Sequence, residues 1–400
     1  MKIETDIVII GGGIAGLWLL NRLRQQGFSV VLLEANTLGG GQTIVSQGII
    51  HGGMKYALLG TLTPAAKAIA EMPLVWRHCL EGGGEIDLSG VPILSSHQYL
   101  CSTGKLTSKL TTFFAGLALK SHVQAVQKAD FPSLFQHKKF KGRLYSLDEM
   151  VVDVPALIHE LAKPHREAII KINPLREEQI KMDANHKIME LSVETTFSSL
   201  SIQIQAQKYI FTAGAGNEML FNKLKLPSLA MQRRPLQMVI VKHAFPDKIY
   251  AHYLGLSATP RITITSHAAA DGQTIWYLGG DLAESGVKRS PVEQIAFAQQ
   301  ELMALFPWLD FSTARFASFY IDRAEPYQPD GKRPDSCFIK EIENMIVAWP
   351  TKLAFAPLVA RETLQILANH AIQRRVQPSL MLSSQDCPAV AKPVWEDRLC

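Results

Sequence analysis

The sequence is poor in cysteine and has no long hydrophobic run. Its five cysteines are odd in number and widely spaced, with no Cys-x-x-Cys pair. This spacing argues against a disulfide framework or a cysteine-based zinc site, and it predicts reduced thiols in a cytosolic protein. No apolar run reaches the roughly 20 residues that cross a bilayer. We therefore expect a cytoplasmic protein, with peripheral contact at the inner membrane as an open alternative.

A concentrated basic region is missing as well. The net charge is +5 over 400 residues, but the basic residues are scattered, and the densest groups, 137–141 and 374–375, are short. This distribution argues against nucleic acid as a partner and suits a small anionic molecule or an anionic membrane surface. The chain also has no internal repeat and no long linker. Its length predicts two domains, each with its own hydrophobic core.

The N-terminal residues have the pattern of a βαβ unit. Ile3–Ile10 is an apolar strand, GGGIAG follows, Leu17–Gln26 is a helical run, and Ser29–Leu33 is a second apolar strand. An apolar second strand is typical of a parallel sheet that is covered on both faces. The later strands expected from the pattern are Lys208–Thr212, Met238–Lys242, Arg261–Thr265, Ile275–Leu278 and Met345–Trp349. The expected helices are Ala65–Leu80, Pro155–Lys163, Pro291–Phe306 and Pro357–Gln373.

The turn in this unit predicts a dinucleotide site. Gly11, Gly13 and Gly16 fit G-x-G-x-x-G, and Glu34 ends the second strand. In such a motif the glycines allow a tight turn and a close approach to a pyrophosphate, which the helix N-terminus attracts. An ionised carboxylate only accepts hydrogen bonds, so Glu34 can hold two ribose hydroxyls. Glycines, strand, helix and acid together are a more specific signal than the glycines alone.

A second glycine-rich segment favours FAD over NAD. GGGQT at 39–43 continues into SQGIIHGGMK at 46–55. A nicotinamide dinucleotide needs no second cradle so early in the chain. A flavin dinucleotide has a ribityl chain and a three-ring head that the backbone must surround. The sequence therefore predicts FAD.

At this point the chain resembles a known family. GGGIAG…LLEA followed by GGGQTIVSQGIIHGGMKY is similar to the D-amino-acid-oxidase superfamily of flavoproteins. Within it, the likeness is strongest to glycerol-3-phosphate dehydrogenases and oxidases and to L-2-hydroxyglutarate dehydrogenase. Five further segments resemble family motifs in the same order: Pro155–Ile172, Phe211–Gly216, Arg234–Met238, Asp322–Gly331 and Trp349–Pro357.

The resemblance implies an α/β fold in which a Rossmann-type FAD-binding domain is interleaved with a mixed-sheet α+β substrate domain. We expect the FAD-binding domain to comprise residues 1–80, 150–220 and 325–400. The substrate domain would then comprise 81–149 and 221–324. Motif and resemblance together predict non-covalent FAD contacts from Gly11, Gly13, Ile14, Ala15, Gly16, Glu34, Ala35, Gln42, Thr43, Ser46, Gln47, Gly48, Ile50, Thr212, Ala213, Gly214, Thr351 and Leu353. Some relatives attach flavin covalently through a histidine, which is the less favoured alternative.

His51 is the predicted catalytic base, because the resemblance places it near the reactive N5 edge of the flavin. Oxidising a carbon that bears OH or NH requires a proton to leave the heteroatom. An imidazole, with a usual pKa near 6.5, suits that role at neutral pH. The alternative is a loop histidine that only satisfies a hydrogen bond.

Two cations complete the predicted site. Arg323 resembles the arginine that binds the substrate's carboxylate or phosphate, and a guanidinium can hold such a group at two points. Its alternative is a salt bridge with Asp322 or Glu325. Lys352 would stabilise negative charge on the reduced flavin or anchor the substrate, and its alternative is an exposed lysine. Three weaker pocket candidates are Lys55, Tyr56 and Arg261.

Two segments depart from the family pattern and argue against carrying over the substrates of the similar enzymes. The last loop, 348–357, contains no glycine, and Ala-Glu stands between Arg323 and Pro326. We expect an FAD-dependent dehydrogenase that oxidises a C–OH or C–N bond of a small anion, such as a 2-hydroxy acid or a polyol phosphate, by hydride transfer to flavin N5. Electrons would pass to a quinone or to oxygen. The alternatives are an amine or amino-acid oxidase and a non-catalytic flavin-binding protein.

Overall fold

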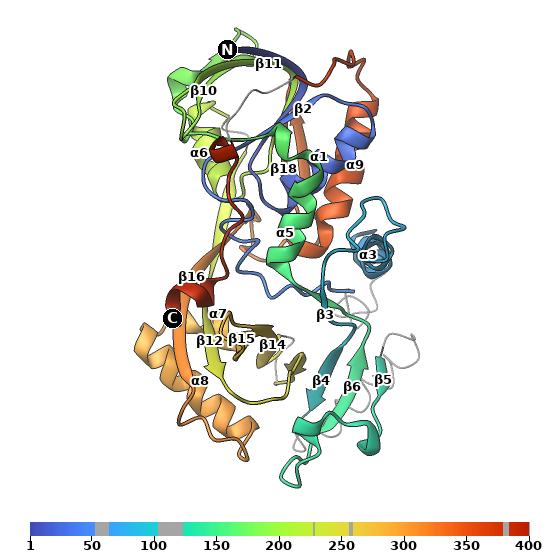
Figure 1. Cartoon of the computed structure of the whole chain (residues 1–400), viewed down its shortest axis with the longest axis vertical. Helices are drawn as coiled ribbons and strands as arrows, with labels where there is room; N and C mark the ends of the chain where they lie inside the picture. Colours follow the sequence, from blue (N-terminus) through green and yellow to red (C-terminus); the bar gives the residue numbers. More distant parts are fainter. Residues whose placement is uncertain (53–63, 103–122, 227–228, 256–258, 379–383, 400) are drawn as a thin grey trace.

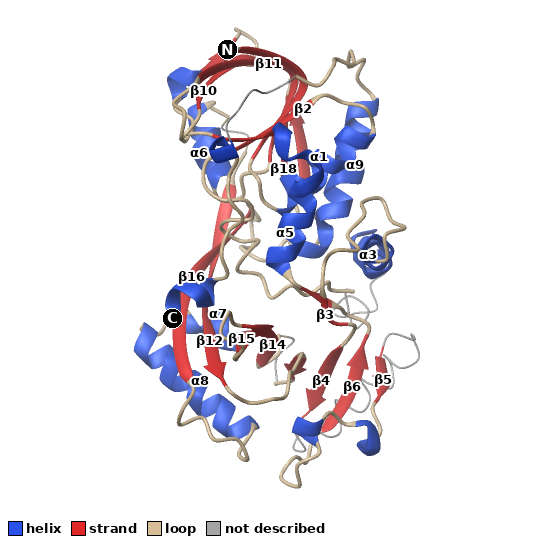
Figure 2. Cartoon of the chain, in the orientation of Figure 1, coloured by secondary structure: helices blue, strands red, loops and turns tan. Residues whose placement is uncertain are grey.

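The computed structural model describes residues 1–52, 64–102, 123–226, 229–255, 259–378 and 384–399. Two eight-stranded sheets lie toward opposite ends of the molecule's long axis (Figure 1). Figure 2 shows that helices flank each sheet, so the predicted α/β class is confirmed. The domain boundaries given above stay a prediction.

The first sheet has a parallel centre and contains the N-terminal βαβ unit. Its strand order is β17 (Phe338–Ile342), β18 (Met345–Trp349), β11 (Ser201–Phe211), β1 (Lys2–Ile10), β2 (Val30–Glu34) and β8 (Ile169–Lys171). Two antiparallel strands extend it from β11, namely β10 (Ile188–Glu194) and β9 (Ile180–Met182). Strand β1 pairs in parallel with both β11 and β2. The carboxyl ends of β1, β2 and β11 therefore meet at one edge, where cofactors bind in such sheets.

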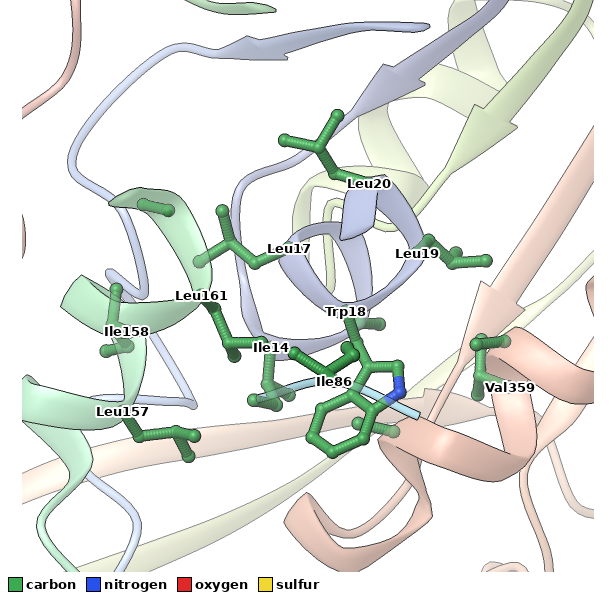
Figure 3. Packing of buried hydrophobic residues seen from close by; sticks show 14 of the residues in the cluster. Ile14, Leu17, Trp18, Leu19, Leu20, Ile86, Leu157, Ile158, Leu161 and Val359 are labelled. Carbon is green, nitrogen blue, oxygen red and sulfur yellow. The ribbon is translucent and has the colours of Figure 1, made fainter. Parts of the chain in front are cut away.

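Helix α1 (Ile14–Gln25) crosses from β1 to β2 and is packed between two other helices. These are α5 (Val154–Ala162) and α9 (Ala356–Ala368). Figure 3 shows Trp18 of α1 among aliphatic side chains that include Leu157 of α5 and Val359 of α9, all buried. Burying an apolar side chain of this size contributes about 1.5–3 kcal/mol. The predicted βαβ unit is confirmed, with its helix beginning three residues earlier than expected because the end of the glycine turn is already helical.

The second sheet is mixed and mostly antiparallel. Its order is β16 (Arg315–Pro326), β12 (Met231–His243), β15 (Thr274–Gly279), β14 (Ile262–Ala268), β13 (Ala251–Tyr253), β4 (Gln98–Ser102), β6 (Arg143–Leu147) and β5 (Val123–Ala125). Within this second sheet, the β13–β4 pair is the parallel one among the described strands. Helices α7 (Asp281–Gly286) and α8 (Pro291–Leu305) contact β12. Trp276 and Phe306 are fully buried in the core of this half.

The remaining elements are short, apart from one helix. They are α3 (Pro64–Leu80), α6 (Gly216–Lys223), α10 (Val394–Arg398), and the strand pair β3 (Ile93–Ser95) and β7 (Val151–Val152). Single 3-10 turns occupy Lys128–Asp130, Ser133–Phe135, Lys163–Ala168, Glu177–Gln179, Leu353–Phe355 and Ser384–Asp386. No helix in the described ranges is both long and apolar enough to span a membrane.

Most predicted elements appear with shifted ends. Strand β18 matches its prediction residue for residue, while the predicted helix Pro357–Gln373 ends at Ala368 as α9. It ends early because the chain turns back to the first sheet, where the Gln373 amide donates to Gln207 at 3.0 Å. The four described cysteines form no disulfide with one another: Cys79, Cys101, Cys337 and Cys387.

Candidate active site

The first and last glycines of the predicted motif are required by the chain's own packing. Gly11 has a φ of +109°, which favours glycine, and a Cβ there would lie 2.6 Å from the Ala213 Cα. A Cβ on Gly16 would lie 2.0 Å from the Gly11 carbonyl oxygen. Both distances are far below van der Waals contact. These glycines allow β1, α1 and the segment after β11 to meet.

Gly13 has no such internal reason to be glycine. It caps α1 with an extended backbone (φ −77°, ψ −174°), and a Cβ there would meet only the Thr43 hydroxyl, at 3.4 Å. The cap residue, Gly13, has no side chain to bond the helix, and the first turn of α1 contains no acidic residue. A helix N-terminus with open N–H groups and no bulky neighbour is suited to a phosphate. The turn therefore fits the diphosphate of FAD.

Glu34 lies directly beside this turn. Its two carboxylate oxygens accept hydrogen bonds from the Gly12 amide at 2.6 Å and from the Asn36 amide at 2.7 Å. Glu34 and the next residue, Ala35, are only partly buried. A carboxylate has about four lone-pair positions, so acceptor capacity remains for ribose hydroxyls.

The second glycine segment and the turn after β11 both contact the first turn. The Ile14 amide donates to the Thr43 hydroxyl at 3.2 Å. On the other side, the Thr212 hydroxyl donates to the Gly11 carbonyl at 2.9 Å. The predicted cofactor residues 11–16, 42–43 and 212–214 thus come together, with the buried Ile14 and Ala15 beneath them.

Residues 42–47 reach from this turn to the second sheet. The Gln42 amide donates to the Ala324 carbonyl of β16 at 3.5 Å, and the nearest atom to a Cβ on Gly214 would be the same Gln42 nitrogen, at 3.6 Å. The Gln47 amide donates to the Tyr277 carbonyl of β15 at 2.8 Å. Ser46 keeps a buried hydroxyl with no partner among the described residues. A buried polar atom without a partner is uncommon and indicates a missing ligand or water.

The segment that carries His51 is fixed against residues 149–152. The Val152 amide donates to the Gly48 carbonyl at 3.0 Å, and the Ile50 amide donates to the Met150 carbonyl at 2.9 Å. Gly48 has a φ of +72°, and a Cβ there would lie 2.3 Å from the Val152 carbonyl oxygen. Ile50 is fully buried. This pairing brings the next residue along each segment, His51 and Glu149, side by side.

His51, Glu149 and His252 form a compact cluster, called here the His–Glu–His cluster. His51 Nδ1 lies 3.1 Å from Glu149 Oε2, and His252 Nε2 lies 3.7 Å from the same oxygen. The two imidazole rings are stacked with centroids 6.2 Å apart. The side chain of His51 is 37% exposed, whereas those of Glu149 and His252 are 7% and 5% exposed. His51 is thus partly exposed, with its Nδ1 paired to a buried carboxylate.

The electrostatics of the cluster keep Glu149 ionised. Burial raises the pKa of Glu149, but the field of His51 and hydrogen bonds from both imidazoles outweigh it and hold that pKa well below the usual range. Loss of hydration lowers the pKa of His51, and Glu149 opposes part of that fall. A neutral imidazole beside a buried carboxylate is a suitable proton acceptor at neutral pH.

Arg323 lies on β16, and its partner differs from both alternatives considered from the sequence. Its guanidinium donates to Glu284 at 3.4 Å and to the Arg234 carbonyl at 3.2 Å. Asp322 and Glu325 instead pair with Arg233 and Arg234. Burial and the neighbouring Arg234 lower the pKa of Arg323, although an arginine stays protonated in proteins.

The last loop, which contains no glycine, adopts a strained backbone at Thr351. Thr351 has a φ of +57°, and its hydroxyl donates to the Ser336 carbonyl at 3.0 Å. A β-branched residue in this conformation costs about 1–2 kcal/mol. The Lys352 ammonium lies 5.1 Å from the centre of the Phe355 ring, and Leu353 begins the 3-10 turn that leads into α9. Strain of this kind is concentrated at functional sites.

Of the three weaker candidates, only Arg261 lies in the described part of the chain, and its guanidinium is paired away from the His51 segment. Arg261 forms an ion pair with Glu301 of α8, and Lys55 and Tyr56 lie outside the described residues. Sequence reasoning missed Glu149 and His252. Neither residue lies in a recognisable sequence motif. Glu149 is revealed as a site residue by the pairing of residues 48–52 with 149–152.

Comparison with known proteins gives the same assignment. A family model described as "FAD dependent oxidoreductase" matches residues 6–364. A probable FAD-dependent oxidoreductase of Pseudomonas aeruginosa is 47% identical over 398 residues, which is 98% of each chain. The crystal structure of an FAD-dependent oxidoreductase from that organism covers 100% of this chain and 99% of its own, with a TM-score of 0.83 and 42% identity.

A more distant structure supports the fold. The L-α-glycerophosphate oxidase of Mycoplasma pneumoniae, solved with FAD bound, has a TM-score of 0.66 at 16% identity and covers 94% of this chain and 98% of its own. The predictions of the family, the fold class and FAD as cofactor are confirmed. With the glycine turn shaped for a diphosphate and a family model across most of its length, this chain belongs to the FAD-dependent oxidoreductase family.

Proposed function

We propose that the protein is a dehydrogenase that oxidises a C–OH or C–N bond of a small anionic substrate, with His51 as the proton acceptor. The observation that carries this proposal is the His51 ring, whose Nδ1 lies 3.1 Å from a buried carboxylate while the side chain stays 37% exposed. A histidine with no catalytic role would not need a buried charged partner, since burying a carboxylate is costly.

We place FAD along the edge where β1, β2 and β11 end. The helix α1 N-terminus at Gly13 would face the diphosphate and Glu34 would face a ribose. The segment 42–50 and the strained Thr351 would surround the rest of the cofactor. Bound there without a covalent link, FAD supplies a two-electron acceptor for the hydride. The remaining cofactor contacts are those predicted from the sequence.

Protein side chains would accept the substrate's proton and bind its negative charge. His51 would take the proton from the substrate heteroatom as the C–H bond is broken. Arg323 is the proposed anchor for the carboxylate or phosphate, and it already binds one carboxylate, that of Glu284. Because the Glu284 side chain is 39% exposed, a substrate anion could replace it. Lys352 is the second proposed anchor.

An anaerobic substrate screen tests the proposal. The purified protein is mixed with 2-hydroxy acids, polyol phosphates, amines and amino acids, and the loss of flavin absorbance is followed. We expect reduction by at least one small anion. Rapid peroxide formation in air would identify an oxidase, and reduction of a quinone analogue would identify a dehydrogenase. Flavin that no compound of the panel reduces would contradict the proposal and favour a non-catalytic flavin protein.

Two partners remain proposals. The electron acceptor is a quinone or oxygen, and peripheral contact with an anionic membrane would bring the protein close to a quinone. Vesicle co-sedimentation with and without anionic lipid tests that contact. Binding that does not depend on anionic lipid would contradict it, because the net charge of +5 is the feature that suggests it.

A further inference from the structure

The cluster around His51 contains two residues that the sequence did not single out. Glu149 comes from the loop between β6 and β7, and His252 comes from β13 of the second sheet. Each has a further partner that fixes its orientation. Glu149 Oε1 accepts a hydrogen bond from the Gly52 amide at 3.1 Å, and His252 Nδ1 lies 2.8 Å from the Thr263 hydroxyl. Glu149 Oε2 is therefore directed at the two imidazoles.

From this arrangement we infer that Glu149 and His252 are positioning residues that make His51 a one-sided proton acceptor. The inference rests on the proposed function of His51. Glu149 holds the tautomer in which Nδ1 carries the hydrogen and donates it to Oε2, which leaves Nε2 free on the exposed side. The same logic applies to a histidine held by a buried aspartate in hydrolases. His252 braces Glu149 from beside His51, with its Nε2 3.7 Å from the same carboxylate oxygen.

The charge balance explains why the carboxylate is buried. With both imidazoles neutral, the His–Glu–His cluster carries one negative charge. When the substrate's heteroatom–hydrogen bond breaks, the proton goes to His51 Nε2 and the cluster becomes neutral. Among the described residues, the fields of His252 and Arg333 both oppose protonation of His51 by lowering its pKa. Glu149 is therefore the group that favours proton uptake.

A metal ion is the competing explanation for two histidines and a glutamate whose ligand atoms lie within 4.8 Å of one another. Hydrogen bonding is favoured by the geometry. His51 and Glu149 are already at hydrogen-bond distance, and both the second oxygen of Glu149 and the second nitrogen of His252 have protein partners. The cluster is satisfied without an ion, and the metal content of the protein separates the two explanations.

The test is ¹⁵N NMR of the holoenzyme with labelled histidine, with the His51 signals assigned through a His51→Gln variant. We expect the wild-type ring to carry its hydrogen on Nδ1. In Glu149→Gln the pKa of His51 should fall, because the carboxylate charge is lost, and Glu149→Asp should restore part of it. Where a substrate is found, Glu149→Gln should slow flavin reduction by roughly 10- to 100-fold, a part of the 10²–10⁴ that a positioned base contributes.

A matched control uses another His–Glu pair on the surface. His159 Nδ1 lies 3.0 Å from Glu160 Oε1, but the His159 side chain is 56% exposed. Glu160→Gln should therefore leave the rate of flavin reduction unchanged. His252→Gln provides a second variant if Glu149→Gln does not fold, and it should weaken the Nδ1–H preference of His51.

Three results would overturn the inference. The first is a His51 tautomer and pKa that neither Glu149→Gln nor His252→Gln changes. The second is a wild-type ring protonated on Nε2. The third is stoichiometric zinc or another transition metal in the purified protein that is lost in Glu149→Gln. None depends on turnover, so a failure here is distinct from a failure of the substrate screen, which alone tests the proposed function.

Discussion

The two sides of the candidate site are built in different ways. At the glycine turn, the decisive contacts join main-chain atoms: a Cβ on Gly16 would lie 2.0 Å from the carbonyl oxygen of Gly11, five residues earlier in the chain. At the His–Glu–His cluster, the contacts join side chains, and His51 and Glu149 are 98 positions apart in the sequence. The fit of Gly16 against Gly11 depends on residues that are close in sequence. The His–Glu–His cluster forms only after both sheets have formed.

The largest expected effect comes from adding one methyl group to the glycine turn. Gly16→Ala places a Cβ 2.0 Å from the Gly11 oxygen, which the backbone can relieve only by moving α1 away from β1. We expect loss of bound flavin and of most folded protein, measured by flavin absorbance and thermal unfolding. A folded variant with normal flavin content would show that the turn is not as rigid as this comparison requires.

Acid should affect the second sheet before the first. Burial lowers the pKa of His243 and of His267 to about 4, from a usual value near 6.5. Because the folded-state pKa lies below the unfolded one, the stabilisation is complete above pH 6.5 and is lost as the pH falls toward 4. The loss approaches roughly 3 kcal/mol for each ring. Hydrogen exchange at pH 7 and pH 4.5 should show protection lost first in residues 231–279.

A pair of variants tests this assignment. His267→Gln should reduce the acid sensitivity of unfolding, whereas His159→Gln, which removes an exposed histidine, should not. The prediction would be contradicted if both sheets lost hydrogen-exchange protection at the same pH and neither variant changed the acid sensitivity of unfolding.

The smallest expected effect is at Gly13, where the chain itself leaves room for a side chain. A Cβ there meets only the Thr43 hydroxyl, at 3.4 Å. We expect Gly13→Ala to fold with nearly unchanged thermal stability but to bind FAD about tenfold more weakly, a loss of about 1.4 kcal/mol. Flavin titration checks this. Unchanged affinity would mean that the diphosphate does not approach Gly13.

The contrast also explains what the sequence could and could not predict. The βαβ unit, its glycines and Glu34 follow from local periodicity and spacing, and the structure brings these residues together as expected. The end of α9 was predicted too late in the chain. The Gln373 amide donates to the side chain of Gln207 in β11, a contact between distant segments that local sequence does not indicate. Glu149 and His252 could not be found because their roles depend on contacts between segments far apart in the chain.

Arg323 shows the same limit. Its neighbours in sequence, Asp322 and Glu325, were the natural candidates for an ion pair. However, Asp322 forms an ion pair with Arg233 of β12 and Glu325 forms one with Arg234, while Arg323 pairs with Glu284 of α7. Each of these side chains therefore pairs with a residue of another element rather than with its neighbour in sequence.

The most direct test of the account is the rate of anaerobic flavin reduction in His51→Ala, measured together with FAD content in the same sample. With any substrate that reduces the wild type, we predict full FAD content and reduction slowed by roughly two to four powers of ten. His159→Ala serves as the control and should match the wild type. Reduction at the wild-type rate in His51→Ala would contradict the account.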